Sequence, residues 1–167
     1  MLLPWRDVEF EGITFNTSLT QREADELQRL TVRQYVLEVG SAYGYSSRVM
    51  SSTASHVFAV DPHAGELPGS LKKMRDNLSG VDNVTIMVGY SDSVLPALLE
   101  VGARFGLVFI DGCHLHPQVD RDLGWARSLG DVVAVHDYHE DTCPDVAEAV
   151  DEIYGTPRNL IDTLAVF

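Results

Sequence analysis

Short apolar, β-branched runs alternate along the chain with stretches of helical spacing, and this alternation most constrains the fold. The runs are almost continuously apolar, as expected for strands that are buried on both faces of a parallel sheet. Regular alternation of this kind predicts an α/β protein, a single three-layer domain with a doubly wound, mostly parallel sheet. The predicted strands are 36–39, 57–60, 84–88, 107–110 and 132–135, and the predicted helices are 44–53, 67–78, 94–101, 119–126 and 146–153.

The two ends of the chain follow this pattern less regularly. Residues 1–15 are expected to be irregular, and Thr20 with Glu23 forms a capping-box signal that begins a helix. The tail, 160–167, has β character. We therefore predict an N-terminal segment and helix over residues 1–33, followed by the main domain over residues 34–167.

Charge narrows the range of partners. The 167-residue chain has 25 acidic and 12 basic side chains, a formal net charge of −13. Such a charge repels phosphate backbones and anionic membrane surfaces, so we expect neither nucleic acid nor membrane as a partner, and small neutral or cationic ligands remain. The chain has only two cysteines, no long apolar run and no recognisable secretory signal at its start, which together predict a cytoplasmic protein.

Polar residues gather where the predicted strands end. In doubly wound sheets, ligands bind beyond the carboxyl ends of the strands. The polar segments expected at that edge are 38–41, Asp61, 90–93, 111–116 and 136–139. This edge is therefore the candidate site.

A glycine turn follows the first predicted strand of the main domain, where residues 36–47 read VLEVGSAYGYSS. Gly40 and Gly44 allow close approach of a ligand to the backbone, and amides at the helix start can face a carboxylate or phosphate. Asp61, 21 positions after Gly40, is placed to accept hydrogen bonds from both hydroxyls of a ribose. The dinucleotide pattern G-x-G-x-x-G fails, because Ala42 and Ser47 stand at glycine positions, and this disfavours a nucleotide-dependent oxidoreductase.

The remaining pattern, E-x-G-S-x-x-G-x-S, resembles motif I of the class I S-adenosylmethionine-dependent methyltransferases. FIDGCH (109–114), VHDY (135–138) and the following PDVAEAVDE are similar to the small-molecule methyltransferases grouped as methyltransferase domain 24. The resemblance covers residues 34–167. It implies a Rossmann-like methyltransferase fold, S-adenosyl-L-methionine as cofactor and methyl transfer to a small-molecule acceptor, with a hydroxyl oxygen expected.

The same resemblance implies where the cofactor binds. The residues expected on its methionine side are Glu38, Gly40, Ser41, Gly44 and Ser46. Asp61 is expected to bind the ribose, and Asp111 also to contact the cofactor. The residues expected near the adenine are Gly89, Tyr90 and Ser91, with Asp92 as a candidate partner for its amino group.

Four chemically active residues, Asp111, His114, His136 and Asp137, are expected to converge at neighbouring strand ends and to carry the catalysis. Methyl transfer to oxygen needs either a base that removes the proton or a metal that stabilises the oxyanion. His136 is the predicted base, since imidazole titrates near neutrality, and Asp111 or Asp137 would orient it.

Two metal hypotheses stay open. Asp111, His136 and Asp137 could hold a divalent ion, although His136 stands where related metal-dependent enzymes are expected to carry an acid, which disfavours Mg²⁺. A softer set could suit zinc: Cys113, His114, His116, His136, His139 and Cys143. Its spacing matches no common structural zinc pattern. Cys143, directly before Pro144, is predicted to begin a helix rather than to act as a nucleophile.

The parts expected to cover the acceptor are short. We hypothesise that a second subunit, as in a homodimer, or a broad pocket completes the site. A module that binds the cofactor without catalysis is the alternative function.

Overall fold

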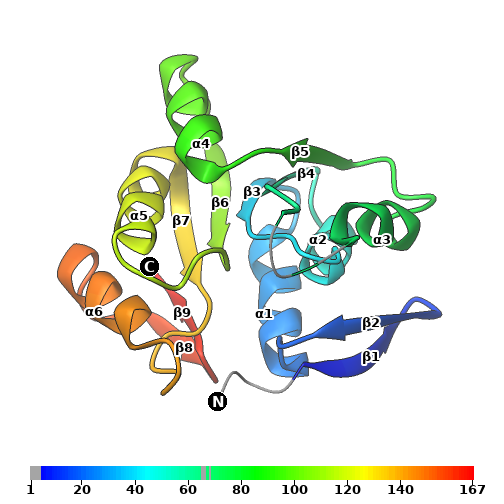
Figure 1. Ribbon diagram of the computed structural model, residues 1–167, viewed down its shortest axis with the longest axis horizontal. Coiled ribbons are helices and arrows are strands. Elements are labelled where there is room, and N and C mark those ends of the chain that lie inside the picture. Colours follow the sequence, from blue (N-terminus) through cyan, green and yellow to red (C-terminus); the bar gives the residue numbers. More distant parts are fainter. Residues whose placement is uncertain (1–4, 65–66, 68) are drawn as a thin grey trace.

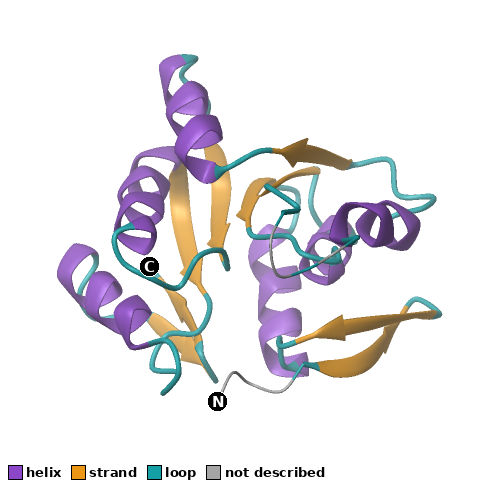
Figure 2. Ribbon diagram, in the orientation of Figure 1, coloured by secondary structure: helices purple, strands orange, loops and turns teal. Residues whose placement is uncertain are grey.

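A seven-stranded sheet forms the centre of the protein in this computed structural model, which describes residues 5–64, 67 and 69–167 (Figures 1 and 2). Its strand order is β5-β4-β3-β6-β7-β9-β8. The pairs from β5 to β7 are parallel, and β9 joins β7 and β8 in antiparallel register. The predicted doubly wound, mostly parallel sheet is confirmed.

The strands and helices follow the predicted alternation closely. The strands are β1 (Arg6–Phe10), β2 (Ile13–Thr17), β3 (Tyr35–Val39), β4 (His56–Asp61), β5 (Val84–Val88), β6 (Phe105–Ile110), β7 (Gly130–Val135), β8 (Asn159–Ile161) and β9 (Leu164–Val166). The helices are α1 (Gln21–Thr31), α2 (Tyr45–Ser51), α3 (Ser70–Asn77), α4 (Ser91–Glu100), α5 (Gln118–Leu129) and α6 (Pro144–Ile153). None of the helices in the described ranges is long and apolar enough to cross a bilayer.

The N-terminal segment is a β-hairpin, so the expectation of an irregular stretch was wrong for the described residues from 5 onward; residues 1–4 lie outside them. β1 pairs antiparallel with β2. Glu11 and Gly12 connect the strands with φ values of 50° and 76°, the left-handed backbone of a tight two-residue turn. Glu-Gly is a weaker turn signal than Asn-Gly, and so the sequence did not reveal the hairpin.

Two helices begin elsewhere than predicted. α3 begins at Ser70 after Gly69 in the left-handed region, which leaves Leu67 in the preceding loop. α4 begins at Ser91, three residues earlier than the apolar spacing indicated. The capping box of α1 is confirmed, because Thr20 and Glu23 each accept a hydrogen bond from the other's backbone N–H.

Helices cover both faces of the sheet and make the three layers. Leu37, Val108 and Val133 pack with α4, α5 and α6, whereas Val36 and Phe109 pack with α1 and α2. This packing on both faces explains why the parallel strands are almost continuously apolar. Burying each such side chain contributes about 1.5–3 kcal/mol to the free energy of unfolding. The sheet that carries the strand-end residues is therefore stabilised by packing on both of its faces.

Candidate functional site

A cavity of about 790 Å³ lies at the carboxyl ends of the parallel strands, where the sequence placed the site. Its size suits a small organic molecule. The strand-end residues on its wall include Gly40, Ser41 and Ser46 near β3, Asp61 after β4, Gly89, Tyr90 and Ser91 after β5, Asp111 and His114 after β6, and Asp137 after β7. The structure therefore brings most of the predicted site residues around one space.

The glycine turn is forced by its neighbours. Gly40 has φ 90°, and a Cβ there would lie 2.1 Å from the carbonyl oxygen of Asp111. Gly44 has φ 83°, and a Cβ there would lie 2.9 Å from the side chain of Met74. Gly44 precedes α2 without facing the cavity in the part of the chain described here.

Glu38 is fully buried behind that turn and does not belong to the described cavity wall. Its carboxylate oxygens accept hydrogen bonds from the hydroxyls of Ser46 and Ser47, at the start of α2. Burial raises the pKa of Glu38 to about 8, despite these two hydrogen bonds. Glu38 thus ties β3 to α2, and Ser46 is the member of this group that reaches the cavity.

Asp61 faces the cavity and also holds two loops. One of its oxygens accepts a hydrogen bond from the backbone N–H of Ala42 at 2.9 Å, and the other from that of His63 at 2.6 Å. Each carboxylate oxygen has further acceptor capacity. Asp61 can therefore organise the glycine turn and still accept hydrogen bonds from a ligand.

His136 lies inside the protein rather than on the described cavity wall, with an exposed fraction of 1%. Its Nε2 is 3.3 Å from Oε2 of Glu23, and its Nδ1 is 3.2 Å from Asp111 and 3.3 Å from Asp137. Burial acts to lower the pKa of His136, but these carboxylates raise it well above its ordinary value. An enclosed imidazole is poorly placed to take a proton from a molecule in the cavity. His136 as the base stays a prediction, and the geometry favours a histidine that reaches the cavity wall.

Glu23 is a functional candidate that sequence reasoning missed. It is fully buried, and besides His136 it accepts hydrogen bonds from the backbone N–H and the hydroxyl of Thr163, between β8 and β9. Burial acts to raise the pKa of Glu23, but His136 and the backbone donors outweigh it and lower the pKa to about 2. The capping box identified Glu23 as a helix start without showing that it reaches across the fold.

His114 is the imidazole on the cavity wall. Its Nε2 is 3.1 Å from Oδ2 of Asp137 and 3.7 Å from Oδ1 of Asp111. Burial acts to lower the pKa of His114, but the two carboxylates raise it. In turn, His136 and His114 lower the pKa of Asp111 to about 2 against the effect of burial. This arrangement places an imidazole beside two carboxylates on the cavity wall.

Among the described residues, two overlapping groups have the donors for a metal ion. In the first, Asp111, His136 and Asp137 offer one atom each, all within 4.8 Å of one another. Because Nε2 of His136 faces Glu23, its Nδ1 is directed at the two aspartates, as in many metal sites where a carboxylate orients a histidine ligand. This mixed nitrogen and oxygen set fits a divalent ion that accepts both donors better than it fits Mg²⁺.

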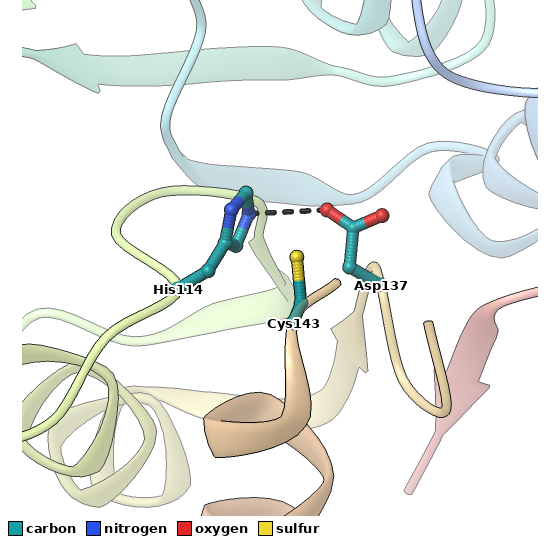
Figure 3. A group of neighbouring side chains, drawn as sticks. All are labelled: His114, Asp137 and Cys143. Carbon is teal, nitrogen blue, oxygen red and sulfur yellow. Dashed lines mark ion pairs between the residues drawn. The ribbon is translucent and has the colours of Figure 1, made fainter. Parts of the chain in front are cut away.

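The second group is His114, Asp137 and Cys143, whose side chains point toward one another in Figure 3. It keeps only His114 and Cys143 of the predicted soft-ligand set and adds Asp137. Of the other four members, His136 is buried in the first group, and three are exposed outside this one: Cys113, His116 and His139. Cys143 is buried and precedes the first residue of α6, as predicted. Burial raises the pKa of its thiol, so it is not an activated nucleophile.

The remaining wall residues separate into expected and missed ones. Tyr90 lines the cavity and remains 64% exposed, whereas Asp92 binds Arg121 at 2.9 Å and is not on the described wall. Sequence reasoning missed Trp5, the segment Asn16, Thr17, Ser18 and Leu19, and the α5 residues Gln118 and Asp122. These residues come from the hairpin, its link to α1 and a helix, so no strand-end argument could find them.

Comparisons with known proteins agree with this picture. Residues 37–138, more than half of the chain, match the family Methyltransf_24, described as a methyltransferase domain. The protein-L-isoaspartate O-methyltransferase of Protochlamydia amoebophila (strain UWE25) is 33% identical over 81 residues, which are 47% of this chain but only 37% of that curated relative. The chain thus spans well under half the length of that relative.

Solved structures show the same fold at low identity. The O-methyltransferase from Bacillus cereus in complex with SAH has a TM-score of 0.66 and 18% identity, covering 81% of this chain and 68% of that one. The O-methyltransferase TomG from Streptomyces achromogenes in complex with SAM has a TM-score of 0.64 and 21% identity, covering 86% of this chain and 71% of that one.

Proposed function

Because the chain belongs to the Methyltransf_24 family of S-adenosylmethionine-dependent methyltransferases, we propose that it transfers the methyl group to a hydroxyl oxygen of a small molecule. The observation that carries this proposal is His114, an imidazole on the cavity wall whose Nε2 faces Asp137 and Asp111. Oxygen acceptors need a group that removes their proton, and we assign this role to His114.

The cofactor is proposed to lie along the ends of β3, β4 and β5. Asp61 would accept hydrogen bonds from the ribose, and the turn residues from Gly40 to Tyr43 would face the methionine part. Gly89, Tyr90 and Ser91 would flank the adenine. The sulfonium would then lie in a cavity whose described lining residues include four aspartates and neither lysine nor arginine, which suits its positive charge.

In the proposed reaction the acceptor oxygen forms a bond to the methyl carbon as the carbon–sulfur bond breaks, in line. The hydroxyl proton passes to His114, and S-adenosylhomocysteine leaves as the neutral thioether. Since Nε2 of His114 faces the carboxylates, Nδ1 is the nitrogen that we assign to the proton. Asp111 and Asp137 then stabilise the imidazolium that forms.

A divalent ion is a further part of this proposal. Asp111, His136 and Asp137 would hold it, with Glu23 orienting His136. When bound, such an ion polarises an acceptor oxygen and favours its deprotonated form. The role that we propose for His114 is the same with or without that ion.

The charge of the cavity supports a neutral or cationic acceptor. Its described wall contains the carboxylates of Asp61, Asp111, Asp122 and Asp137, and neither lysine nor arginine is among the described lining residues. A carboxylate acceptor would face these acids without a lysine or arginine among the described lining residues, at a Coulombic cost. The name of the curated relative refers to isoaspartate, but the wall of this cavity favours an uncharged hydroxyl over a carboxyl group.

Two measurements test this function in order. Calorimetric titration with S-adenosylhomocysteine is expected to show one site per chain. The second measurement follows the formation of S-adenosylhomocysteine from S-adenosylmethionine in the presence of neutral, cationic or carboxylate-bearing acceptors. We expect turnover with the first two classes. Absence of binding would refute the cofactor site. Binding without turnover on any acceptor would favour the non-catalytic module, and turnover confined to carboxylates would overturn the hydroxyl acceptor.

A further inference from the structure

We infer that His114, Asp137 and Cys143 form a site for a zinc-like divalent transition-metal cation, and that a cation held there switches off the active site by occupying His114. The binding of the cation stands on the structure of this group. Its effect on activity rests on the proposed function, in which His114 takes the acceptor proton.

The three side chains come from separate segments and converge (Figure 3). His114 follows β6, Asp137 follows β7 and Cys143 precedes α6. One donor atom from each lies within 4.8 Å of the other two, and Nε2 of His114 is 3.1 Å from Oδ2 of Asp137. Around a tetrahedral zinc ion, with ligands at about 2.0–2.3 Å, donor atoms lie about 3–4 Å apart, so small side-chain movements would close the site.

The donor atoms lack better partners. Nε2 of His114 is buried and, within the described part of the chain, makes no hydrogen bond of acceptable geometry, even with the carboxylate beside it. The Cys143 side chain is 3% exposed, and its sulfur has only a long contact of 3.9 Å with the hydroxyl of Thr142. Buried polar atoms without partners are costly, and a cation would give both atoms one.

The donor set selects the kind of cation. A thiolate and an imidazole favour zinc or cobalt over magnesium or calcium, which prefer oxygen ligands. This site differs from the group that contains His136, because only this one includes Cys143. The two groups share Asp137, whose Oδ1 faces His136 and whose Oδ2 faces His114. Since His114 and Asp137 line the cavity, the fourth position of the ion would open into it.

Occupation of this site has a direct chemical consequence. A neutral imidazole with a metal on Nε2 carries its single proton on Nδ1. His114 in that state has no lone pair for the acceptor proton. A zinc ion at this site is therefore expected to inhibit methyl transfer, and a chelator to restore it.

The binding experiment uses the chelator-treated full chain with zinc chloride, in competition with a chromophoric chelator, and cobalt chloride as a spectroscopic probe. Wild type should bind one ion per chain and show a thiolate-to-cobalt absorption band. Cys143→Ser should lose the band and bind zinc at least about a hundredfold more weakly, since even outer-sphere changes cost 10- to 100-fold. Serine suits the position before a helix, and Cys143→Ala is the second variant should the first fail to fold.

Cys113→Ser is the matched control, because Cys113 is exposed and outside the group. It should keep both the affinity and the absorption band. Equal zinc affinity in the Cys143 variants and wild type, or no stoichiometric binding to wild type, would overturn the site.

The activity experiment separates this inference from the proposed function. Cys143→Ser should retain the basal rate while requiring at least about a hundredfold more zinc for inhibition, following the loss of affinity. Zinc binding through Cys143 in a protein that methylates nothing would refute the proposed function and leave the metal site standing. Zinc binding through Cys143 with full activity would overturn the inhibitory role.

Discussion

His114 and His136 both lie close to the same two aspartates, yet of the two only His114 lies on the described cavity wall. His136, at the end of β7, is enclosed by Glu23, Asp111 and Asp137 and is 1% exposed. His114 is carried by the loop after β6, and 28% of its side chain is exposed. The comparison teaches that convergence at the sheet edge does not by itself make a histidine available to a substrate.

The largest expected effect comes from His114. His114→Asn removes the proposed proton acceptor, so the methyl-transfer rate at saturating substrates should fall by about 10²- to 10⁴-fold. The affinity for S-adenosylhomocysteine, measured by calorimetry, should change little. His116→Asn is the control, since His116 is exposed and bound to Asp120. Loss of both rate and affinity in equal measure would mean that His114 shapes the site rather than accepting the proton.

The second-largest expected effect is a loss of stability on substitution of the buried His136. His136→Ala leaves Glu23 buried without its cationic partner, and breaking such a pair typically costs about 3–5 kcal/mol in the free energy of unfolding. Denaturant unfolding measures this loss. His139→Ala, at an exposed histidine, should cost far less. A His136→Ala protein of normal stability with a large loss of rate would return the base to His136.

The pH dependence of stability sharpens the role of Glu23. Its pKa in the folded protein, about 2, is below its ordinary value of 4.5, so its contribution is present above pH 4.5 and is lost as the pH falls toward 2. The stability difference between wild type and Glu23→Gln, measured by urea unfolding, should therefore shrink below pH 4.5. A difference that stays constant over this range would show that the charge of Glu23 is not what stabilises this region.

The smallest expected effect concerns Asp61, which we propose binds the ribose of the cofactor. Asp61→Asn weakens charge-assisted hydrogen bonds to the ribose, so S-adenosylhomocysteine should bind about tenfold more weakly. The rate at saturating S-adenosylmethionine should remain close to that of wild type, in contrast to His114→Asn. Unchanged affinity in a titration of Asp61→Asn would remove Asp61 from the cofactor site.

Much of the site could be read from the sequence because it depends on topology. Asp61, Asp111 and Asp137 each follow an apolar strand, and parallel strands present such positions at one edge. The family motif pointed to the same positions. The burial of each site residue could not be predicted from the sequence, because it depends on which other segments pack over that residue. Glu23, 113 positions from His136 in the chain, covers that histidine from α1.

The hairpin shows the same limit at the N-terminus. Phe10 of β1 and Phe15 of β2 pack against Tyr45 of α2. Only the folded protein shows that the end of β2 and the link after it form part of the cavity wall. Asn16 and Leu19 therefore became site residues without any motif. The domain boundary at residue 34 remains a prediction.

The sequence by itself determined the order of strands and helices from α1 onward, the parallel sheet and the glycine turn, since these depend on local apolar spacing and on backbone freedom at Gly40. The tertiary structure decided that His114 reaches the cavity and that Cys143 lies beside it. Burial and the pairing of charges arise from contacts between segments far apart in the chain, and no local pattern encodes them.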